Sequence, residues 1–217
     1  MNNGQIGSIL DFENVGRRSP PDIRPGVWQV DDPIGTTWGY TSDMRVSGPG
    51  PVIGKLADTV SKNGTYLLNL SPRADGTIPQ EQQDTLLEIG RWMEVNGEAI
   101  YGTHNWVTFG EDGVGGEGGL RVRYTVKGDV LYAIMLGAWP GAEVVIPSLA
   151  TGRDLGGAIK TVTLLGAEGR LAFTRDANGL KVKLPAAAPC EHGYTLRITG
   201  LKTNPPTWTE SGNPPTP

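Results

Sequence analysis

The sequence predicts an α+β protein in which strand and helix units precede a mainly antiparallel β-sandwich. A change of period along the chain predicts this order. Between residue 37 and about residue 100 the apolar positions alternate between strand and helix spacing, and after Trp106 they recur every second residue. The 32 glycines and 17 prolines stand between short apolar segments, so we expect many turns and therefore many strands.

The first half is expected to contain long loops and then, from residue 37 to about residue 100, a strand, a helix, a strand and a helix. Residues 1 to about 36 have Gly, Pro and Asp at close intervals and no sustained period, which predicts loop structure. A helix should follow, with Pro51 in its first turn and Gly64 as its C-terminal cap. Its apolar positions at helical spacing are Val52, Ile53, Leu56, Ala57 and Val60. The continuous apolar run from Thr65 to Leu70 predicts a strand covered on both faces.

A second helix is expected from about residue 80. Thr77 and Gln80 have the spacing of a capping box, and Pro79 suits the first turn. Asn96 and Gly97 are expected to end this helix. Its predicted apolar side carries Leu86, Ile89, Gly90 and Met93.

Seven short apolar segments with turn residues between them predict the β-sandwich. They are LRVRYTV, VLYAIML, EVVIPSL, KTVTLLG, RLAFTR, GLKVKL and YTLRITG. We therefore expect a first domain at residues 1–106 and a sandwich at residues 107–201. The segment GEDGVGGEGG at this boundary is expected to be a connector or a long hairpin loop. Residues 202–217 are rich in Pro and Thr and are expected to form a disordered linker.

Composition excludes several classes of function. The formal net charge of -4 comes from 19 basic and 23 acidic residues that are interspersed, so neither nucleic acid nor a membrane surface is an expected partner. No signal peptide is expected in this chain. Localisation stays unknown, because secreted and periplasmic locations are both open for a longer parent protein. Cys190 is expected to be a small buried or half-buried side chain. With His104 and His192 as the two histidines, we expect no metal site and no cofactor.

Two motifs are set aside. The segment from Gly48 to Lys55 is superficially like a phosphate loop, but its glycine spacing is wrong and Leu56 follows the lysine. No G-x-S-x-G elbow occurs in the sequence. A serine esterase-type hydrolase stays open as an alternative, because a triad can be assembled in space from distant residues.

Three blocks of sequence resemble the end of the catalytic domain of family 29 α-L-fucosidases. They are TWGY at residues 37–40, SKNGTYLLNLSPRADGTIP at residues 61–79 and LLEIGRWMEVNGEAIYGT at residues 86–103. The resemblance implies that the first domain is a partial (β/α) barrel remnant and that the strands up to residue 201 are the family's C-terminal β-sandwich. A complete barrel with a sandwich would need roughly 350 residues, so the chain of 217 residues is expected to be a C-terminal portion.

The same resemblance implies retaining hydrolysis of terminal α-L-fucose, with a fucosylated glycan as the partner. This chemistry uses an aspartate nucleophile and a second carboxylate that serves as acid and then as base. In the family the nucleophile follows a Trp on an earlier barrel strand, and the fucose-binding histidines also lie upstream. We therefore expect the nucleophile to be absent from this chain, and the chain to be incomplete as a catalyst.

The acid/base carboxylate is the one catalytic position that the resemblance places in this chain. Some family members carry this Glu directly after a Trp, where this sequence has Trp28 and then Gln29, and an amide cannot exchange a proton at neutral pH. Other members carry it about 25 residues before the aromatic residue of the WGY-like motif. That position is Glu13, which becomes the candidate acid/base, with a solvated loop carboxylate as the alternative.

Trp38 and Trp28 are the candidate substrate-binding residues. Trp38 matches an aromatic residue that in the family packs against the apolar face of the sugar, and ordinary core packing is its alternative. Trp28 lies in the same predicted loop region. Arg17 and Arg24 also fall there, and surface or structural roles are expected for both.

Further expectations concern loops, alternatives and assembly. Asn63, Asn69 and Arg73 lie in the most family-like block and are expected to hold loops rather than touch substrate. A non-catalytic carbohydrate-binding or structural β-sandwich is the main alternative function. Strand edges left without the rest of a barrel would be exposed, so we expect a homo-oligomer that covers them.

Overall fold

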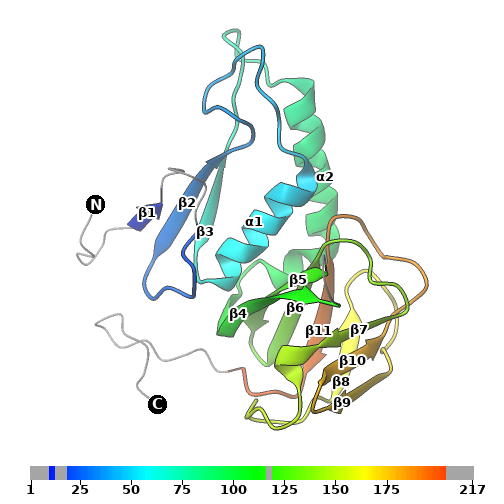
Figure 1. Cartoon of the computed structure of the whole chain (residues 1–217). Helices are drawn as coiled ribbons and strands as arrows, with labels where there is room; N and C mark the ends of the chain where they lie inside the picture. Colours follow the sequence, from blue (N-terminus) through cyan, green and yellow to red (C-terminus); the bar gives the residue numbers. More distant parts are fainter. Residues whose placement is uncertain (1–9, 13–18, 116–118, 204–217) are drawn as a thin grey trace.

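The computed structural model describes residues 10–12, 19–115 and 119–203, and it has three sheets and two long helices (Figure 1). The first sheet is parallel and has the order β1 (Leu10–Phe12), β2 (Trp28–Pro33) and β3 (Thr65–Asn69). The helices are α1 (Pro49–Ser61) and α2 (Gln80–Asn96). The predicted α+β class, with part of a barrel followed by a β-sandwich, is confirmed. Neither helix is long and apolar enough to cross a membrane within these described residues.

The sandwich consists of the other two sheets. One has five strands in the order β4 (His104–Val114), β5 (Leu120–Lys127), β6 (Val130–Leu136), β11 (Tyr194–Thr199) and β8 (Thr161–Leu164). The other has three strands in the order β7 (Glu143–Ile146), β10 (Gly179–Lys183) and β9 (Phe173–Asp176). Two short 3-10 helices, η1 (Gly97–Ala99) and η2 (Pro147–Leu149), follow α2 and β7. The seven predicted strands are all present, whereas the domain boundary near residue 106 stays a prediction.

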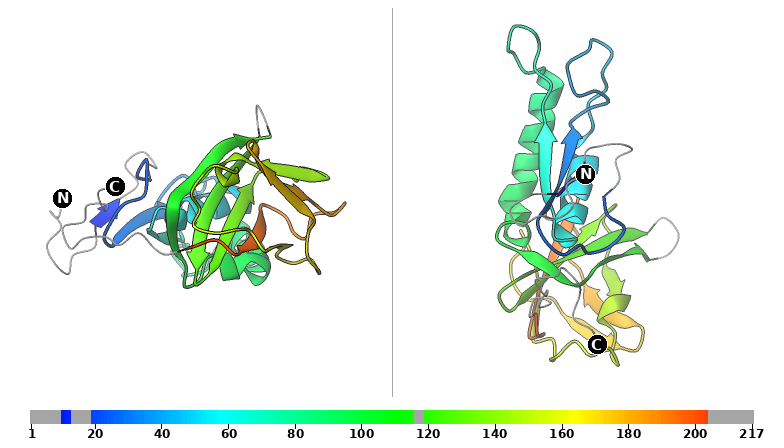
Figure 2. Two further views of the ribbon diagram at one scale, coloured as in Figure 1. Left: turned by 90° about the horizontal axis from the view of Figure 1, so that it is seen from below. Right: turned by 90° about the vertical axis from the view of Figure 1, so that its left-hand side faces the viewer.

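The five-stranded sheet is covered on both faces, and β6 shows why. Its residues 131, 133 and 135 lie in the core between the two sandwich sheets, while residues 132, 134 and 136 pack against α1 and α2. A strand buried on both faces has a continuous apolar sequence, as in VLYAIML. The helices therefore form one layer between the parallel sheet and the sandwich (Figure 2).

The strand expected from residue 37 is wrong, because the described residues 37–48 form a loop with one isolated bridge, between Gly35 and Val46. Two strands in the first domain and one in the sandwich were not predicted. β1 and β2 lie in the segment expected to be loop, and β2 is the central strand of the parallel sheet. β4 takes up the first part of the expected connector, GEDGV. Its pairing with β5 has register shifts after Asn105 and after Glu111, and these bulges interrupt the two-residue period that marks a strand.

The expected cap of α1 was assigned to the wrong residue. Asn63, not Gly64, takes the left-handed conformation after α1, with a φ of 71°. Gly64 is needed for another reason, because a Cβ atom there would lie 2.4 Å from the Trp28 ring. The expectation that β3 is covered on both faces is also wrong for the described residues, because Leu67 is 50% exposed.

Helix α2 starts without the predicted capping box. Pro79 stands at its N-cap with no side-chain hydrogen bond, and the Thr77 hydroxyl instead donates to Asp75 in the preceding loop, at 2.7 Å. Three of the buried side chains of α2 are polar, so the spacing of apolar residues alone does not identify this face. The buried residues of α2 are Gln82, Thr85, Trp92 and Asn96.

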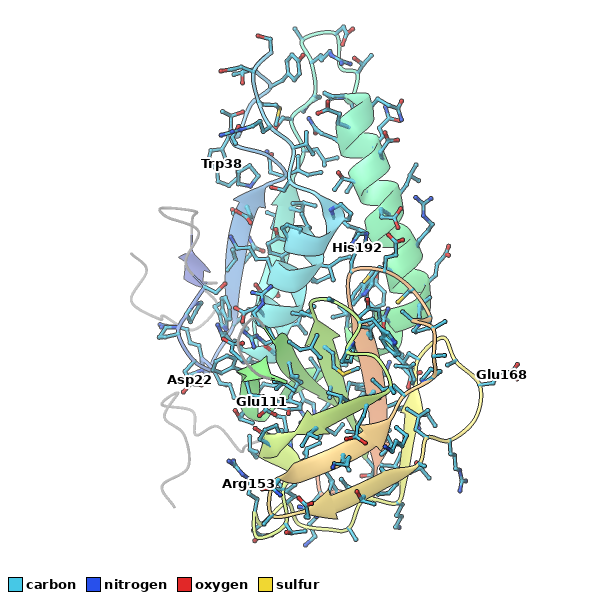
Figure 3. The ribbon with its side chains drawn as sticks, turned by 45° about the vertical axis from the view of Figure 1, so that its right-hand side comes forward. Asp22, Trp38, Glu111, Arg153, Glu168 and His192 are labelled. Atoms are coloured by element: carbon cyan, nitrogen blue, oxygen red, sulfur yellow. The ribbon has the colours of Figure 1, made fainter. Side chains whose placement is uncertain are left out.

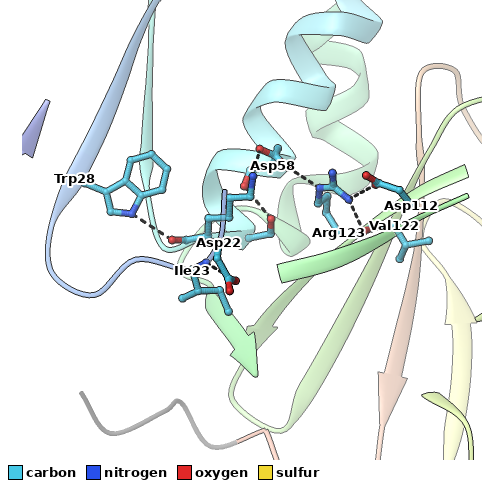
Figure 4. Close-up of polar contacts among 9 residues, drawn as sticks. Asp22, Ile23, Trp28, Asp58, Asp112, Val122 and Arg123 are labelled. Atoms are coloured by element: carbon cyan, nitrogen blue, oxygen red, sulfur yellow. Dashed lines mark hydrogen bonds and ion pairs between the residues drawn. The ribbon is translucent and has the colours of Figure 1, made fainter. Parts of the chain in front are cut away.

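A charged contact joins α1 to the five-stranded sheet (Figure 4). The Arg123 guanidinium from β5 donates to Asp58 of α1 at 2.7 Å and to Asp112 of β4 at 2.8 Å. Asp58 also accepts a hydrogen bond from Lys62 at 2.8 Å. The side chains of Arg123 and Asp58 are only 6% and 17% exposed, whereas Asp112 is 64% exposed. The Asp58 contact is therefore the shielded one of the two.

Replacing Asp58 should destabilise the protein far more than replacing Asp112. Asp58→Ala leaves the buried Arg123 and Lys62 without their shared carboxylate, and we expect a loss of about 3 kcal/mol in the free energy of unfolding. Asp112→Ala removes an exposed partner and should cost under about 1 kcal/mol. Urea denaturation followed by circular dichroism measures both variants. Equal losses would show that burial does not set the strength of this contact.

Candidate functional site at the carboxyl edge of the parallel sheet

The parallel sheet brings two loops together at one edge. β2 and β3 run in the same direction, with Gln29 opposite Thr65 and Pro33 opposite Asn69. The loops that leave their carboxyl ends, residues 34–48 and 70–79, lie side by side at the top of the molecule (Figure 1). Barrel enzymes place substrates at this edge of the strands. A substrate site built on these strands would therefore lie at this edge.

Trp38 is presented at this edge with a fixed backbone (Figure 3). Its carbonyl oxygen accepts hydrogen bonds from Asn69 Nδ2 and from the Ser71 hydroxyl, both at 2.9 Å. The side chain is 48% exposed, so it is not a core tryptophan within the described residues. An exposed indole on a fixed backbone offers a flat apolar surface to a ligand.

The Ser71 backbone is held in turn by α2. Gln82 accepts a hydrogen bond from the Ser71 N–H and donates one to the Ser71 carbonyl, each at 3.0 Å. Gln82 and Ser71 are both fully buried. A chain of polar contacts thus runs from α2 through Ser71 to Trp38, and sequence reasoning missed it because it rests on a polar helix face.

Tyr40 and Arg73 lie in the same two loops and contact each other. The Arg73 guanidinium lies 5.4 Å from the centre of the Tyr40 ring, which is within cation–π range. The adjoining turn is ordered by Asp75, which accepts hydrogen bonds from both the hydroxyl and the N–H of Thr77. The Thr77 hydroxyl, and then its N–H, lower the pKa of Asp75 below its usual value. The turn therefore holds an ionised carboxylate close to Arg73.

Trp28 does not share this edge. It is 1% exposed, and its Nε1 donates to the Lys62 carbonyl at 3.2 Å at the end of α1. Arg24 precedes β2 and is exposed, and its N–H donates to the same Lys62 carbonyl at 3.2 Å. A substrate contact by Trp28 stays a prediction that this geometry does not favour. Glu13 and Arg17 lie outside the described residues.

Asn63 and Asn69 both hold loops. Asn63 Nδ2 donates to the carbonyls of Arg24 and Gly26 at 3.1 and 3.2 Å, beside the amino end of β2. Asn69 donates to Trp38, as described above. Both contacts are to backbone oxygens, in line with the structural role expected for these two side chains.

Asp32 is a carboxylate that the sequence did not single out. It is 7% exposed and points towards α1, where it pairs with Lys55 Nζ at 2.8 Å. The Tyr66 hydroxyl donates to the same carboxylate oxygen at 3.0 Å. With a lysine and a phenol already bound to one oxygen, Asp32 is suited to fixing β2 on α1 rather than to proton transfer.

A large cavity lies elsewhere, between α1 and strands β5 and β6. Its volume is about 1060 Å³, and charged side chains line it. Asp58 pairs there with Lys62 and Arg123, and Lys55 pairs with Asp32, so most of these charges neutralise one another. Among the described residues that line it there is no tryptophan, tyrosine or phenylalanine, unlike at the edge that carries Trp38.

One group of side chains has the spacing of metal ligands. His192 Nε2 lies 3.7 Å from Glu88 and 3.8 Å from Glu191. Glu88 is already bound by Arg91, and Glu191 is 81% exposed. The group lies beside α2, away from Trp38 (Figure 3). The expectation of no metal in the site stays a prediction.

Cys190 and the histidines show no catalytic grouping in the described part of the chain. Cys190 is half-buried, as predicted, and burial raises the pKa of its thiol. His104 Nδ1 contacts the Asn105 carbonyl at 2.8 Å. No hydrogen bond between a serine hydroxyl and a histidine ring occurs among the described residues, so no serine triad is assembled there.

Two family models match the chain in sequence order. The model described as Alpha-L-fucosidase matches residues 1–98, and the model described as Alpha-L-fucosidase C-terminal domain matches residues 119–199. Human tissue α-L-fucosidase is 36% identical over 178 residues, which are 76% of this chain and 35% of that protein. Rat plasma α-L-fucosidase is 33% identical over 197 residues, 85% of this chain and 41% of that protein. The chain thus spans less than half the length of these relatives.

Solved structures agree with the sequence matches. The Thermotoga maritima α-fucosidase in complex with fucose superimposes with a TM-score of 0.69 and 31% identity, over 82% of this chain and 40% of that chain. α-L-Fucosidase isoenzyme 1 from Paenibacillus thiaminolyticus gives a TM-score of 0.72 and 28% identity, over 88% of this chain and 45% of that chain.

Removing the Gln82 side chain should destabilise the loop that carries Ser71. Gln82→Ala leaves a buried N–H and a buried carbonyl without partners, and we expect a loss of about 2 kcal/mol in the free energy of unfolding. Gln83→Ala is the matched control, because Gln83 is exposed and also donates to a backbone carbonyl, that of Ile78. Its loss should stay under about 1 kcal/mol. Urea denaturation compares the two variants. A loss for Gln82→Ala no larger than that for Gln83→Ala would refute the stabilising role of the Gln82 hydrogen bonds to Ser71.

Proposed function

This chain belongs to the α-L-fucosidase family, glycoside hydrolase family 29, and we propose that it supplies part of the active site for removing terminal α-L-fucose from fucosylated glycans. The observation that carries the proposal is Trp38, half-exposed and held by two hydrogen bonds at the carboxyl edge of the parallel sheet. Because the chain spans about 35% of the human relative, the activity is proposed for the completed barrel.

The proposed chemistry is retaining hydrolysis by two carboxylates. A nucleophilic aspartate, contributed from outside this chain, displaces the leaving group and forms a glycosyl-enzyme. The second carboxylate first protonates the departing oxygen and then removes a proton from the attacking water. We assign that role to Glu13, which directly follows β1 in the sequence. Asp32 cannot replace it, because its carboxylate is buried against Lys55 and Tyr66.

Trp38 is proposed to bind the sugar by stacking. A deoxysugar presents its C6 methyl group and axial C–H groups as an apolar face, and an indole ring matches such a face. The hydrogen bonds from Asn69 and Ser71 fix the backbone of Trp38 before any sugar arrives. Less ordering is then needed on binding, which favours affinity.

A chimera tests the assignment of Glu13. We expect activity on 4-nitrophenyl α-L-fucoside when this chain replaces the matching part of the Thermotoga maritima α-fucosidase. Glu13→Gln should lower kcat by about 100-fold or more, because the amide cannot take the proton from the water that hydrolyses the glycosyl-enzyme. Azide should restore part of the rate, since this nucleophile needs no base.

Glu81→Gln in the same chimera is the control, because Glu81 is exposed on α2 and should leave the rate unchanged. Full activity of the Glu13→Gln chimera would exclude Glu13 as the acid/base. An unsubstituted chimera that folds and binds fucose but never turns over substrate would favour the non-catalytic alternative.

We also propose that the chain alone forms a homo-oligomer. β3 is an edge strand that pairs with β2 alone among the described residues, and Leu67 on it is half-exposed. An edge of this kind offers unpaired backbone groups to a second copy. Light scattering at micromolar concentration should give a multiple of the monomer mass. A clean monomer at these concentrations would contradict the proposal.

A further inference from the structure

Strand alternation gives β2 two chemically different faces. Trp28 and Asp32 both face α1, since Trp28 bonds the Lys62 carbonyl and Asp32 pairs with Lys55. Successive side chains of a strand point to opposite faces. Gln29 and Asp31 therefore project from the face that α1 does not cover, which we call the open face.

The neighbouring strand completes this face. Tyr66 faces α1, because its hydroxyl donates to Asp32. Thr65 and Leu67 consequently lie on the open face, and the register places Thr65 opposite Gln29 and Leu67 opposite Asp31. Leu67 is 50% exposed, and both Gln29 and Asp31 are half-buried.

The open face is too polar for a barrel interior. In a (β/α) barrel the helices lie outside, so the face away from α1 is the interior, which branched apolar side chains normally fill. Here Gln29, Asp31 and Thr65 stand in that position. Gln29 and Thr65 stand near the amino ends of β2 and β3, whereas Asp31 lies two residues before the carboxyl end of β2. Burying a carboxylate without partners is costly, so Asp31 in this position suits a polar ligand.

The hydrogen-bonding groups on this face suit adjacent hydroxyls. Gln29 Nε2 donates to Asp31 Oδ1 at 2.8 Å, and this contact aligns the two side chains. It leaves Asp31 Oδ2 and the Gln29 carbonyl as acceptors and one Gln29 N–H as a donor, with no further bond to them among the described residues. Sugar hydroxyls both donate and accept, so neighbouring hydroxyls match this set.

Leu67 adds an apolar group directly across from Asp31. A sugar that offers both hydroxyls and a methyl group would satisfy the pair and the leucine at once. Deoxygenation at C6 gives fucose this combination. An analogue with a hydroxyl at C6 would place that hydroxyl against Leu67, where the hydroxyl would lose its hydration.

We propose that Gln29, Asp31 and Leu67 form one wall of the fucose site, in which Asp31 and Gln29 bind ring hydroxyls and Leu67 contacts the C6 methyl group. The inference rests on the proposed function and deepens it. Trp38 covers a face of the sugar, whereas this wall selects a 6-deoxy sugar over its 6-hydroxy counterpart.

NMR titration of the 217-residue chain with L-fucose tests the wall. We expect shifts of the Gln29 side-chain amide and the Leu67 methyl groups, and at least about fivefold weaker binding of L-galactose, which has a hydroxyl at C6. Asp31→Ala should weaken L-fucose binding at least about fivefold. Asp84→Ala is the matched control. Asp84 is an exposed residue of α2 that also accepts one hydrogen bond from a glutamine side chain, that of Gln80, at 2.8 Å.

A second pair of variants tests the apolar contact. Leu67→Ala should remove most of the preference for L-fucose over L-galactose, whereas Leu87→Ala, at 60% exposure on α2, should preserve it. Thermal unfolding of each variant, and of Asp31→Asn, confirms that the fold is retained. The Asp31→Ala and Leu67→Ala effects are also measured as KM in the active chimera.

The outcomes separate this inference from the proposed function. If the chimera hydrolyses 4-nitrophenyl α-L-fucoside and neither variant changes KM, the wall is refuted and the proposed function stands. Azide rescue of Asp31→Asn would also overturn the inference, because it would make Asp31 the acid/base. The wall and the proposed function would both be refuted by a folded chimera without activity together with a chain that shows no fucose-dependent NMR shift.

Discussion

One carboxylate, Asp58, determines how the two halves of the described structure sit together. Its oxygens bind Lys62 on its own helix and Arg123 on β5, so α1 is tied to the sandwich. The backbone carbonyl of Lys62 accepts hydrogen bonds from Trp28 and Arg24, which tie the same helix end to β2. Because desolvation offsets much of the attraction in a buried ion pair, this contact fixes position more than it adds net stability.

The loops at the candidate site depend on the same helix layer. Helix α1 lies between β3 and strands β4 and β5, whereas α2 buries Gln82 against the Ser71 backbone. Asn96 of α2 donates to the Trp92 carbonyl of its own helix. Gln82 replaces the missing backbone partners of Ser71, which in turn fixes Trp38. The geometry of the edge is therefore set by α2 and the strand ends, and the loop residues themselves contribute less.

The spacing of apolar residues predicted the elements that bury one or two apolar faces. It failed where polar or charged residues occupy buried positions. Seven of the eight described sandwich strands and both helices follow from it, and β6 is continuous because it is buried on both faces. β2 was missed because only Trp28 and Val30 carry the apolar period in its sequence, WQVDDP, and the next buried position is the charged Asp32. The roles of Gly64 and Thr77 were misassigned, since a local motif does not show that Trp28 packs on Gly64 or that Thr77 bonds Asp75.

Asp31 and Asp32 show most directly what the fold adds to the sequence. They are adjacent and have identical side chains, so a sequence motif does not distinguish them. In the strand, Asp32 points towards Lys55 and Asp31 lies on the open face. A shift of β2 by one residue would reverse both, and it would also turn Trp28 away from Gly64. The Asp32–Lys55 pair and the Trp28 contact thus lock the strand in the orientation that presents Asp31. A structural aspartate on one face is what makes its neighbour available to a ligand on the other.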